Sequence, residues 1–538
     1  MRLRNTFQPR TILSRDEVTR GLRALTWEGI ASTGFSSLTT STFLVAFALA
    51  LGANNFQIGV MASLPFVTDL FQIPAVWVIE RLRRRKVIVI ITWFISQLLW
   101  IPIAFIPIVV EIPSAGAISM LLGLMAVRGI LNALANCGWS SWKRDLVPQN
   151  MLGSYFARRL SLATAVGVIL GLSAGYLLDY WNSGEGGIIG YSCVLLIGLV
   201  FFGLVSPVLM ASIPEPMMPP AAAPRTSFIH AITMPLREQN YWKFLKFLML
   251  WGFASNMAIP FFAVFMLQQL NLPIFTVIAV TMLSEVFTVL SLRLWGPLAD
   301  RFGSKTVLNF STSLFLLVLM AWAFTVITGG HPLIVPLLIV LHIFTGIAVA
   351  GITLTVGTLS FKMAPQDQAT SYLTGASLAD SAGSGLGALA GGSLAELLAE
   401  RTLTLDSSWS SLFRSVKLDS IQLTGYHLLF AVAFIICLLA LWTLQAVREV
   451  GATRREALLT AFMTSLCTGF QWLNPTLDRV FLAISPFSCI EPVKETRREI
   501  HTTINYFGNA GRKPTQIVPA AICVPEKKPP PCMKMVVP

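Results

Sequence analysis

The feature that most constrains this chain is a series of twelve apolar runs, each long enough to cross a lipid bilayer. A transmembrane helix needs about 20 apolar residues, and lipid offers no hydrogen-bond partners to an open strand, so runs of this length predict helices. Only 12% of the 538 residues are charged, against roughly 25% in a soluble domain. The sequence therefore predicts an all-α polytopic membrane protein, with spans at 26–51, 57–78, 87–110, 116–138, 160–181, 188–212, 243–268, 275–295, 306–328, 333–358, 372–398 and 424–447.

Basic residues occur at alternate connections between these spans. The connections at 52–56, 111–115, 182–187, 269–274 and 329–332 contain no Lys or Arg, whereas the N-terminus, the 79–86 turn and the connections at 139–159, 213–242 and 296–305 are basic. Because basic loops stay in the cytosol, both termini are expected there. Membrane orientation also accounts for the net charge of +13 without a nucleic-acid partner. The connection at 399–423, which carries Arg401, Arg414 and Lys417, is the one exception.

An internal repeat divides the spans into two sets of six. Pro148-Gln149 followed by Ser154-Tyr155 recurs as Pro365-Gln366 followed by Ser371-Tyr372, a spacing of 217 residues from 148 to 365. Glycines at 167, 171 and 175, and at 383, 387 and 391, follow the two copies and indicate close helix packing. Repeats of this kind predict two pseudo-symmetric six-helix bundles. The expected regions are a basic N-terminus (1–25), a first bundle (26–212), a Pro/Ala-rich cytosolic linker (213–242), a second bundle (243–447) and a partly disordered cytosolic tail (448–538).

A charged turn with two glycines joins the eighth and ninth spans. Residues 295–306 read Trp-Gly-Pro-Leu-Ala-Asp-Arg-Phe-Gly-Ser-Lys-Thr, and glycine permits the close approach and positive φ of a tight turn. The stretch resembles the G-x-L-A-D-R-x-G-R-K signature of the major facilitator superfamily of secondary transporters, with Ser304 in place of the usual second arginine. The resemblance covers about residues 20–447.

This resemblance implies an MFS-like fold that transports a solute by alternating access. It also implies a conformational latch at the cytosolic face, made by Gly296, Asp300, Arg301, Gly303 and Lys305 and repeated at Glu80 and Arg81. Asp300 would lie near the start of the fifth or eleventh span, where the helix dipole and Arg158 and Arg159 favour an anion. The alternative is a loop whose bases only set the orientation of the chain.

Charges inside the spans are the candidates for substrate or proton handling, because each costs roughly 2.5–3.5 kcal/mol at the centre of a helix. Glu285 precedes Asp300 by fifteen residues, about 22 Å of helix, and so lies near mid-bilayer. Asp69 and Arg128 either handle substrate or protons or form a structural ion pair. Asp380 either joins them or makes structural hydrogen bonds near the cytosolic gate. The set is Glu285, Asp69, Arg128, Asp380 and, near the start of the first span, Glu28.

The sequence contains no phosphate-binding loop and no HExxH, CxxC or GxSxG motif. We therefore expect no catalysis, metal or cofactor. The hypothesis is a monomeric secondary active transporter of the cell membrane that moves a small solute, coupled to protons and with efflux as one open direction. Trp27, Phe66, Trp251 and Phe262 favour an amphipathic or lipophilic solute, unless they are packing residues. Two alternatives are an uncoupled facilitator or importer and a transport-inactive receptor or scaffold that acts through its tail.

Overall fold

A computed structural model describes most of the chain up to Glu449. The described residues are 9–10, 13–39, 42–82, 84–147, 152–182, 187–217, 236–323, 325, 333–364, 369–399, 401, 403–405, 408–411, 414–417 and 421–449. All of them belong to one compact unit, Met1–Ser465. The predicted tail beyond Glu449 and most of the predicted linker, residues 218–235, lie outside the described residues.

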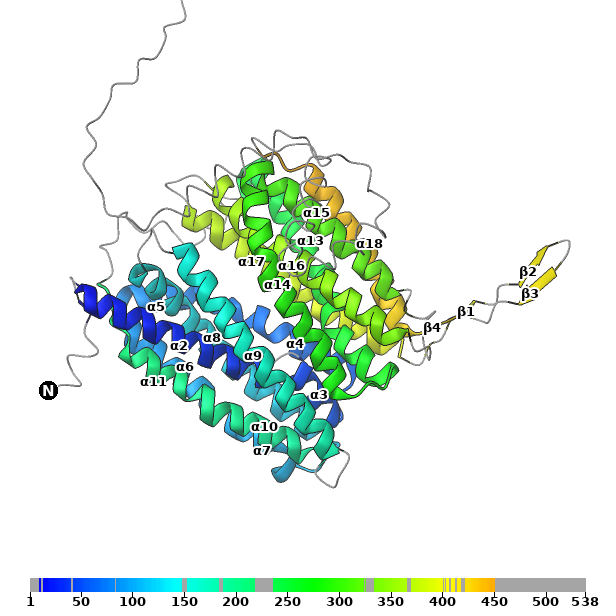
Figure 1. Ribbon diagram of the computed structural model, residues 1–538, viewed down its shortest axis with the longest axis horizontal. Coiled ribbons are helices and arrows are strands. Elements are labelled where there is room, and N and C mark those ends of the chain that lie inside the picture. The colour runs from blue at the N-terminus through cyan, green and yellow to red at the C-terminus, as the bar shows by residue number, and fades with distance from the viewer. Residues whose placement is uncertain are drawn as a thin grey trace, which may run out of the picture. The chain divides into compact units, whose positions relative to one another are not determined.

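Helices make up almost all of the described chain, and Figure 1 shows them coloured from blue at the N-terminus to orange at the last one. The N-terminal half contains α2 (Arg15–Thr39), α3 (Thr42–Ala50), α4 (Asn55–Asp69), α5 (Gln72–Leu82), α6 (Arg85–Leu98), α7 (Trp100–Val109), α8 (Ala115–Leu146), α9 (Leu152–Asn182), α10 (Ile189–Gly198), the π-helical turn η2 (Leu199–Gly203) and α11 (Val205–Ser212). The C-terminal half contains α13 (Gln239–Val264), the π-helical turn η3 (Phe265–Gln269), α14 (Ile274–Phe302), α15 (Ser304–Ala323), α16 (Ile334–Met363), α17 (Ala369–Leu397) and α18 (Gly425–Gln445).

Eleven helical segments in the described part of the chain are long and apolar enough to cross a membrane. The remaining expected span, the eleventh (372–398), is α17, which is equally long at 29 residues but is rich in Gly, Ala and Ser. Its composition fits its position, because α17 packs against α13 on one side and α4 on the other. Small residues let helix backbones approach closely in membranes. The predicted all-helical membrane fold is confirmed. The low hydropathy of α17 reflects contact with protein instead of lipid.

The second glycine series explains how closely α17 approaches α13. A Cβ atom added at Gly383, Gly387 or Gly391 would overlap with a backbone carbonyl oxygen of α13. These three glycines are therefore packing residues, as the sequence indicated. Backbone atoms cannot rotate aside as a side chain can, so α13 and α17 must form a tightly fitted pair.

We expect Gly387→Ala to destabilise the protein by about 1–3 kcal/mol, the usual cost of forcing an extra methyl group into a packed site. Gly357→Ala is the matched control, because nothing lies within 4 Å of the Cβ atom it would add. Thermal unfolding of the purified protein measures both. Equal melting temperatures would contradict the close packing of α13 on α17.

The first helix begins earlier than predicted. The sequence places the first span at 26–51, whereas α2 starts at Arg15. Ser14 and Glu17 form a reciprocal cap: the Glu17 N–H donates to Ser14 Oγ (3.2 Å) and the Ser14 N–H donates to Glu17 Oε2 (3.0 Å). Such a cap satisfies two donors at a helix start, so a polar helical stretch precedes the apolar one.

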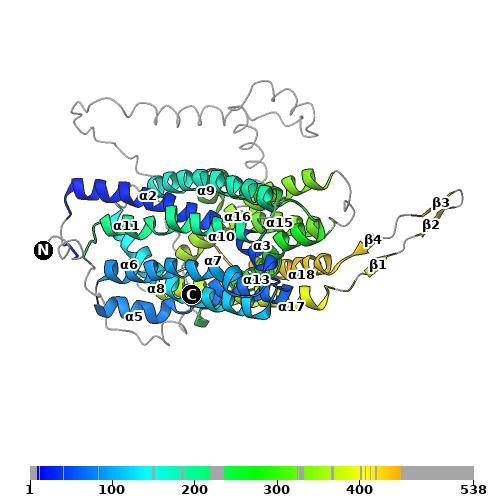
Figure 2. The same cartoon turned by 90° about the horizontal axis from the view of Figure 1, so that it is seen from below.

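Four short strands in the connection between α17 and α18 were not predicted. β1 (Leu403–Leu405) pairs antiparallel with β4 (Ile421–Leu423), and β2 (Ser408–Ser411) pairs antiparallel with β3 (Arg414–Lys417). Both pairings belong to one hairpin, which extends away from the helices in two perpendicular views (Figures 1 and 2). The hairpin occupies the connection whose basic residues are the exception to the charge pattern.

Candidate functional site: the interface between the two halves

The two halves meet through two pairs of antiparallel helices. α4 packs against α17, and α9 packs against α14. We call the side on which α2 begins and α18 ends the terminal side, and the side on which α4 and α14 begin the opposite side. Because each pair is antiparallel, α9 and α17 end on the opposite side.

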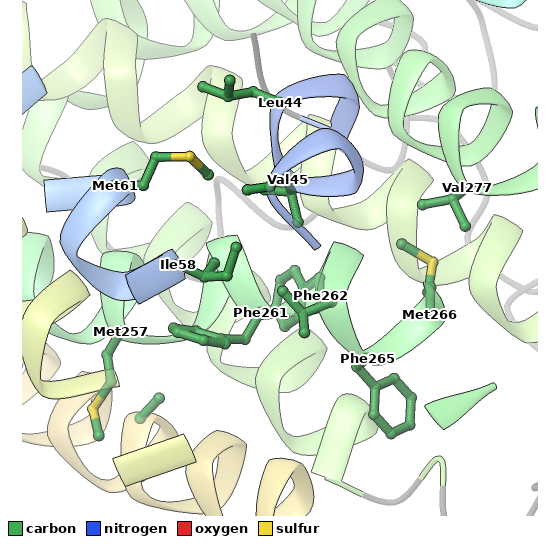
Figure 3. Close-up of a cluster of buried hydrophobic side chains, with 14 of the residues drawn as sticks. Leu44, Val45, Ile58, Met61, Met257, Phe261, Phe262, Phe265, Met266 and Val277 are labelled. Carbon is green, nitrogen blue, oxygen red and sulfur yellow. The ribbon is translucent and has the colours of Figure 1, made fainter. Parts of the chain in front are cut away.

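An apolar cluster joins the halves near the opposite side. Val45 of α3 and Ile58 of α4 lie with Phe261 and Phe262 of α13 and with Val277 of α14 in one group of buried side chains (Figure 3). Ile58, Phe261 and Val277 have no exposed surface. The halves therefore share a dry contact here, which favours the closed arrangement of this side.

A carboxylate of the N-terminal half caps the first helix turn of α14. The N–H groups of Ile274 and Phe275 donate to Asp179, at 3.0 Å to Oδ1 and 2.9 Å to Oδ2. The residue at the helix N-cap, Pro273, offers no side-chain cap. The free donors at the start of α14 are thus satisfied by Asp179, at the end of α9.

A carboxylate of the C-terminal half makes the same contact in the reverse direction. Glu396, at the end of α17, accepts a hydrogen bond of 2.9 Å from the N–H of Asn55, the first residue of α4. The Tyr426 hydroxyl adds a bond of 2.7 Å to Asn55 Oδ1. Asp179 and Glu396 are 217 residues apart, the spacing of the internal repeat. Sequence reasoning missed both acids, although that spacing could have revealed them.

On the terminal side of the C-terminal half, a third carboxylate caps α15. Glu449 accepts from the N–H groups of Ser304 (3.1 Å) and Lys305 (2.6 Å) and from Lys362 Nζ (3.1 Å). Lys305 Nζ in turn donates to the Val447 carbonyl. Lys305, predicted as part of the latch, therefore ties the start of α15 to the chain that follows α18, within one half.

The N-terminal half has a matching network at the start of α6. The N–H of Arg85 donates to Glu215 Oε1 (2.9 Å), and Arg85 Nη1 pairs with Asp145 (2.6 Å). Lys86 Nζ donates to the carbonyl of Ile213 (2.8 Å). Burial raises the pKa of Glu215, against the bonds and charges of Lys86 and Arg85. Glu215 and Glu449, at corresponding places after the sixth and twelfth spans, were also missed by sequence reasoning.

The two networks carry their positive side chain at different members of the same pair of corresponding positions. Asp145 and Lys362 are 217 residues apart, and Arg85 and Ser304 are 219 apart. Where the N-terminal half has an arginine facing an aspartate, the C-terminal half has a serine that accepts a hydrogen bond of 2.9 Å from a lysine. This exchange accounts for Ser304, the position at which the sequence departs from the transporter signature.

The other latch residues form the predicted tight turn. α14 ends at Phe302 and α15 begins at Ser304, with Gly303 between them at φ 90°. Asp300 and Arg301 are exposed, and among the described residues Asp300 has no hydrogen bond or ion pair. Gly296 lies in α14, Arg81 is exposed in α5, and the side chain of Glu80 lies outside the described part.

The structure separates two charges that the sequence allowed to pair. Asp69 accepts a hydrogen bond from Gln72 (2.8 Å), while the Arg128 guanidinium lies 4.8 Å from the centre of the Trp100 ring. Among the described residues no ion pair joins them, so the ion-pair interpretation is not supported. Glu28, in contrast, is buried and paired with Arg159 at 2.7 Å, a contact between α2 and α9 inside one half.

Glu285 and Asp380 carry no hydrogen bond or ion pair to any described residue. The Glu285 side chain is exposed, yet its position on α14 is about 140° around the helix from Leu290, whose side chain is 52% exposed. One turn earlier Thr281 hydrogen-bonds Thr42 of α3, and one turn later Thr288 bonds Gly346 of α16. Glu285 therefore lies on a protein-facing side of α14. His342 of α16 is buried and donates a hydrogen bond of 2.9 Å to the Leu338 carbonyl.

These charges in the spans have no charged counterparts in the repeat. At the spacing of 217–219 residues, Glu285 corresponds to Phe66, Asp69 to Thr288, Arg128 to Thr345 and Asp380 to Ala163. The caps and terminal networks, which hold helices in place, occur twice. A charged residue that occurs in only one half is not needed to hold together the helices that both halves share.

Two of the aromatic residues predicted to favour a lipophilic solute are packing residues. Trp251 stacks edge-on against Phe315 at 4.9 Å, and Phe262 stacks on Trp322 at 4.3 Å, in each case inside the core. In the part of the chain that the structure describes, no group of three or more His, Cys, Asp or Glu side chains could hold a metal ion.

The fold matches several solved transporters at low sequence identity. The nucleoside transporter NupG superposes with a TM-score of 0.56 over 79% of this chain and 98% of its own, at 14% identity. A POT family transporter in complex with a thioalcohol-conjugated peptide gives 0.55 over 80% and 96%, at 14% identity. A bacterial homolog of the human lysosomal transporter Spinster, in an inward-facing and unoccupied conformation, gives 0.54 over 72% and 84%, at 16% identity.

No curated protein matches the chain. The sequence profile of the Major Facilitator Superfamily, however, matches residues 29–328 and again residues 248–490. These matches span both halves and both copies of the internal repeat, and they agree with the helical arrangement described above. The chain belongs to the Major Facilitator Superfamily, a family of membrane transporters.

Proposed function

We propose that this protein is a proton-coupled secondary transporter in which Glu285 carries the proton. Its terminal side faces the cytosol, as the basic connections favour, and the cell membrane is its location. With the halves in contact on the opposite side, the conformation described here corresponds to the inward-facing state. The solute is a small molecule.

The observation that carries this proposal is the carboxyl group of Glu285, which has no partner among the described residues and no charged counterpart in the repeat. A charge that lies in a membrane span without a partner is costly, and a carboxyl group removes the cost by taking up a proton. Its position on the protein-facing side of α14, between contacts to α3 and α16, gives the proton a route that does not cross lipid. Asp380 and Asp69 are the secondary candidates, and Arg128 is the basic group available to the solute or to one of these acids.

The latch completes the proposed cycle. Asp300 has no hydrogen bond or ion pair to any described residue in this conformation. The resemblance to the family signature implies a partner near the start of the fifth span, in the other half, or of the eleventh span. Closing the terminal side would bring the carboxylate to such a helix start, where the dipole favours an anion. Asp300 would then hold the outward-facing state.

We expect Glu285→Gln to abolish proton movement while leaving solute exchange. A thermal-shift screen of the purified protein against a solute library first identifies a ligand. Proteoliposomes containing a pH-sensitive dye then report proton uptake driven by that ligand, and counterflow of radiolabelled ligand reports exchange, which needs no net proton transfer. Glutamine keeps the shape of the side chain and removes the titratable group, so net uptake should fall to the level of empty liposomes.

Glu111→Gln is the control, because Glu111 is an exposed acid in a connection outside the spans. Unchanged proton uptake in Glu285→Gln would assign the coupling to another group. Solute flux without any pH change in the unaltered protein would favour the uncoupled facilitator. Deletion of residues 450–538 should leave flux intact in a transporter, whereas a scaffold that acts through its tail should lose its partners.

A further inference from the structure

We infer that Asp179 and Glu396 form a two-part gate on the opposite side that sets the equilibrium between inward-facing and outward-facing states. Each acid is a positioning residue: it touches no solute and acts by holding two helices of different halves together. The inference rests on the alternating access of the proposed function but not on its coupling to protons.

The first step is that both contacts cross between the halves. Asp179 belongs to α9 and bonds the start of α14, and Glu396 belongs to α17 and bonds the start of α4. Any movement that separates the halves on this side must break both. The hydrogen bonds are charge-assisted, and such bonds are about twice as strong as neutral ones.

The second step is that the contacts use the favourable end of each helix. The start of a helix carries free N–H groups and the positive end of the helix dipole. When the halves separate, water must replace each carboxylate. Asn54 and Gln57 still form a capping box at the start of α4, but the start of α14 has no cap from its own half. Opening this side therefore leaves donors at the start of α14 that the protein itself does not satisfy.

The third step compares the two ends of the same four helices. α9 and α17 end in the acids that cap α14 and α4 on the opposite side. α14 continues to Asp300 on the terminal side, where the carboxylate is exposed and without a bond to any described residue. The acids of the opposite side are engaged while that of the terminal side is free, as expected if the two sides compete for the equilibrium.

The two parts of the gate are not equal. Tyr426 of α18 bonds Asn55 and also lies 2.9 Å from Gln268 Oε1, so the Glu396 contact belongs to a polar cluster that includes the start of α18. Asp179 instead binds both of its N–H donors alone. Removal of Asp179 should thus have the larger effect on the helix that it caps, α14. Tyr426→Phe should weaken the Glu396 part without changing any charge.

Hydrogen–deuterium exchange of the full-length protein in lipid nanodiscs tests the gate without a solute. In Asp179→Asn, the amides at the start of α14 lose their acceptor and should exchange faster. The decisive readout is the start of α4, residues 55–58, which Asp179 does not touch. If the acid sets the equilibrium, exchange there should also rise by about three- to tenfold, the size of effect that a charge at a helix N-terminus has. Glu396→Gln should in turn speed exchange at residues 274–278.

Glu111→Gln removes an exposed acid from the same side without a bond between the halves, and should change neither region. Asp179→Glu keeps the charge and should restore slow exchange at α4, which separates loss of the gate from misfolding. Faster exchange confined to α14 in Asp179→Asn would reduce Asp179 to a local cap and overturn the inference. An equal response to Glu111→Gln would overturn it as well. Neither result would bear on whether Glu285 carries protons.

Discussion

Arg85→Met is expected to destabilise the protein by about 3–5 kcal/mol, the cost of breaking a buried ion pair by removing one partner. The Arg85 side chain has no exposed surface and faces Asp145, 19% exposed, and Glu215, 1% exposed. Methionine fills part of the volume but leaves two carboxylates without their main counter-charge. Thermal unfolding and the yield of folded protein measure the loss.

The defect should shrink as the pH falls. Burial raises the pKa of Glu215, and the loss of Arg85 raises it further. A group whose pKa is raised on folding stabilises the folded state at low pH and ceases to do so as the pH rises through its folded pKa. Arg144→Met, at a neighbouring side chain that is 71% exposed, is the control and should change stability little. Equal effects of the two variants at all pH values would refute a buried ion-pair network at this place.

Lys362→Asp is the second variant with a large expected effect, and Ser304→Arg should rescue it. Alone, Lys362→Asp places a carboxylate beside Glu449, whose side chain is 6% exposed, and should cost about 2–3 kcal/mol through like-charge repulsion and a lost pair. Together the two substitutions copy the arrangement of Arg85, Asp145 and Glu215 into the C-terminal half. The pair should then be more stable than Lys362→Asp alone.

Thermal unfolding of the unaltered protein, the two single variants and the double variant forms a double-mutant cycle. The cycle gives the coupling energy between positions 304 and 362. Residues in one ion-pair network couple by about 0.5–3 kcal/mol, and we expect the upper part of that range because Glu449 is buried. Additive effects would mean that the two halves do not build their terminal networks on the same plan. Lys362→Met separates the loss of a pair from the added repulsion.

The sequence predicted the helices, the repeat and the charged turn, because each depends on local composition. Membrane-length apolar runs determine spans without regard to their partners, and Gly303 alone among its neighbours can adopt φ 90° easily. The start of the first helix was placed too late for the same reason. Hydropathy finds the apolar part of α2 and does not register a polar stretch that a cap makes helical.

Pairing of charges could not be predicted, because it depends on which faces of the helices meet. Asp69 and Arg128 lie in the same half and have opposite charges, yet Asp69 turns to Gln72 and Arg128 to Trp100. Glu28 was grouped with the translocation candidates although it is paired with Arg159. The four capping acids were missed because helix ends read as ordinary polar boundaries. The repeat spacing distinguishes Asp179 and Glu396, which are 217 residues apart, but not Glu215 and Glu449, which are 234 apart.

The gate of Asp179 and Glu396 is self-complementary, since each half gives one carboxylate and one helix start and receives the same in return. Two identical six-helix chains that face each other could make this contact twice, as isologous dimers do. Sealing one face of the membrane thus requires nothing that distinguishes one half from the other. The role we propose for Glu285 does require it: a dimer of identical halves would hold two such carboxyl groups or none, so a single proton-carrying group needs two halves that differ within one chain.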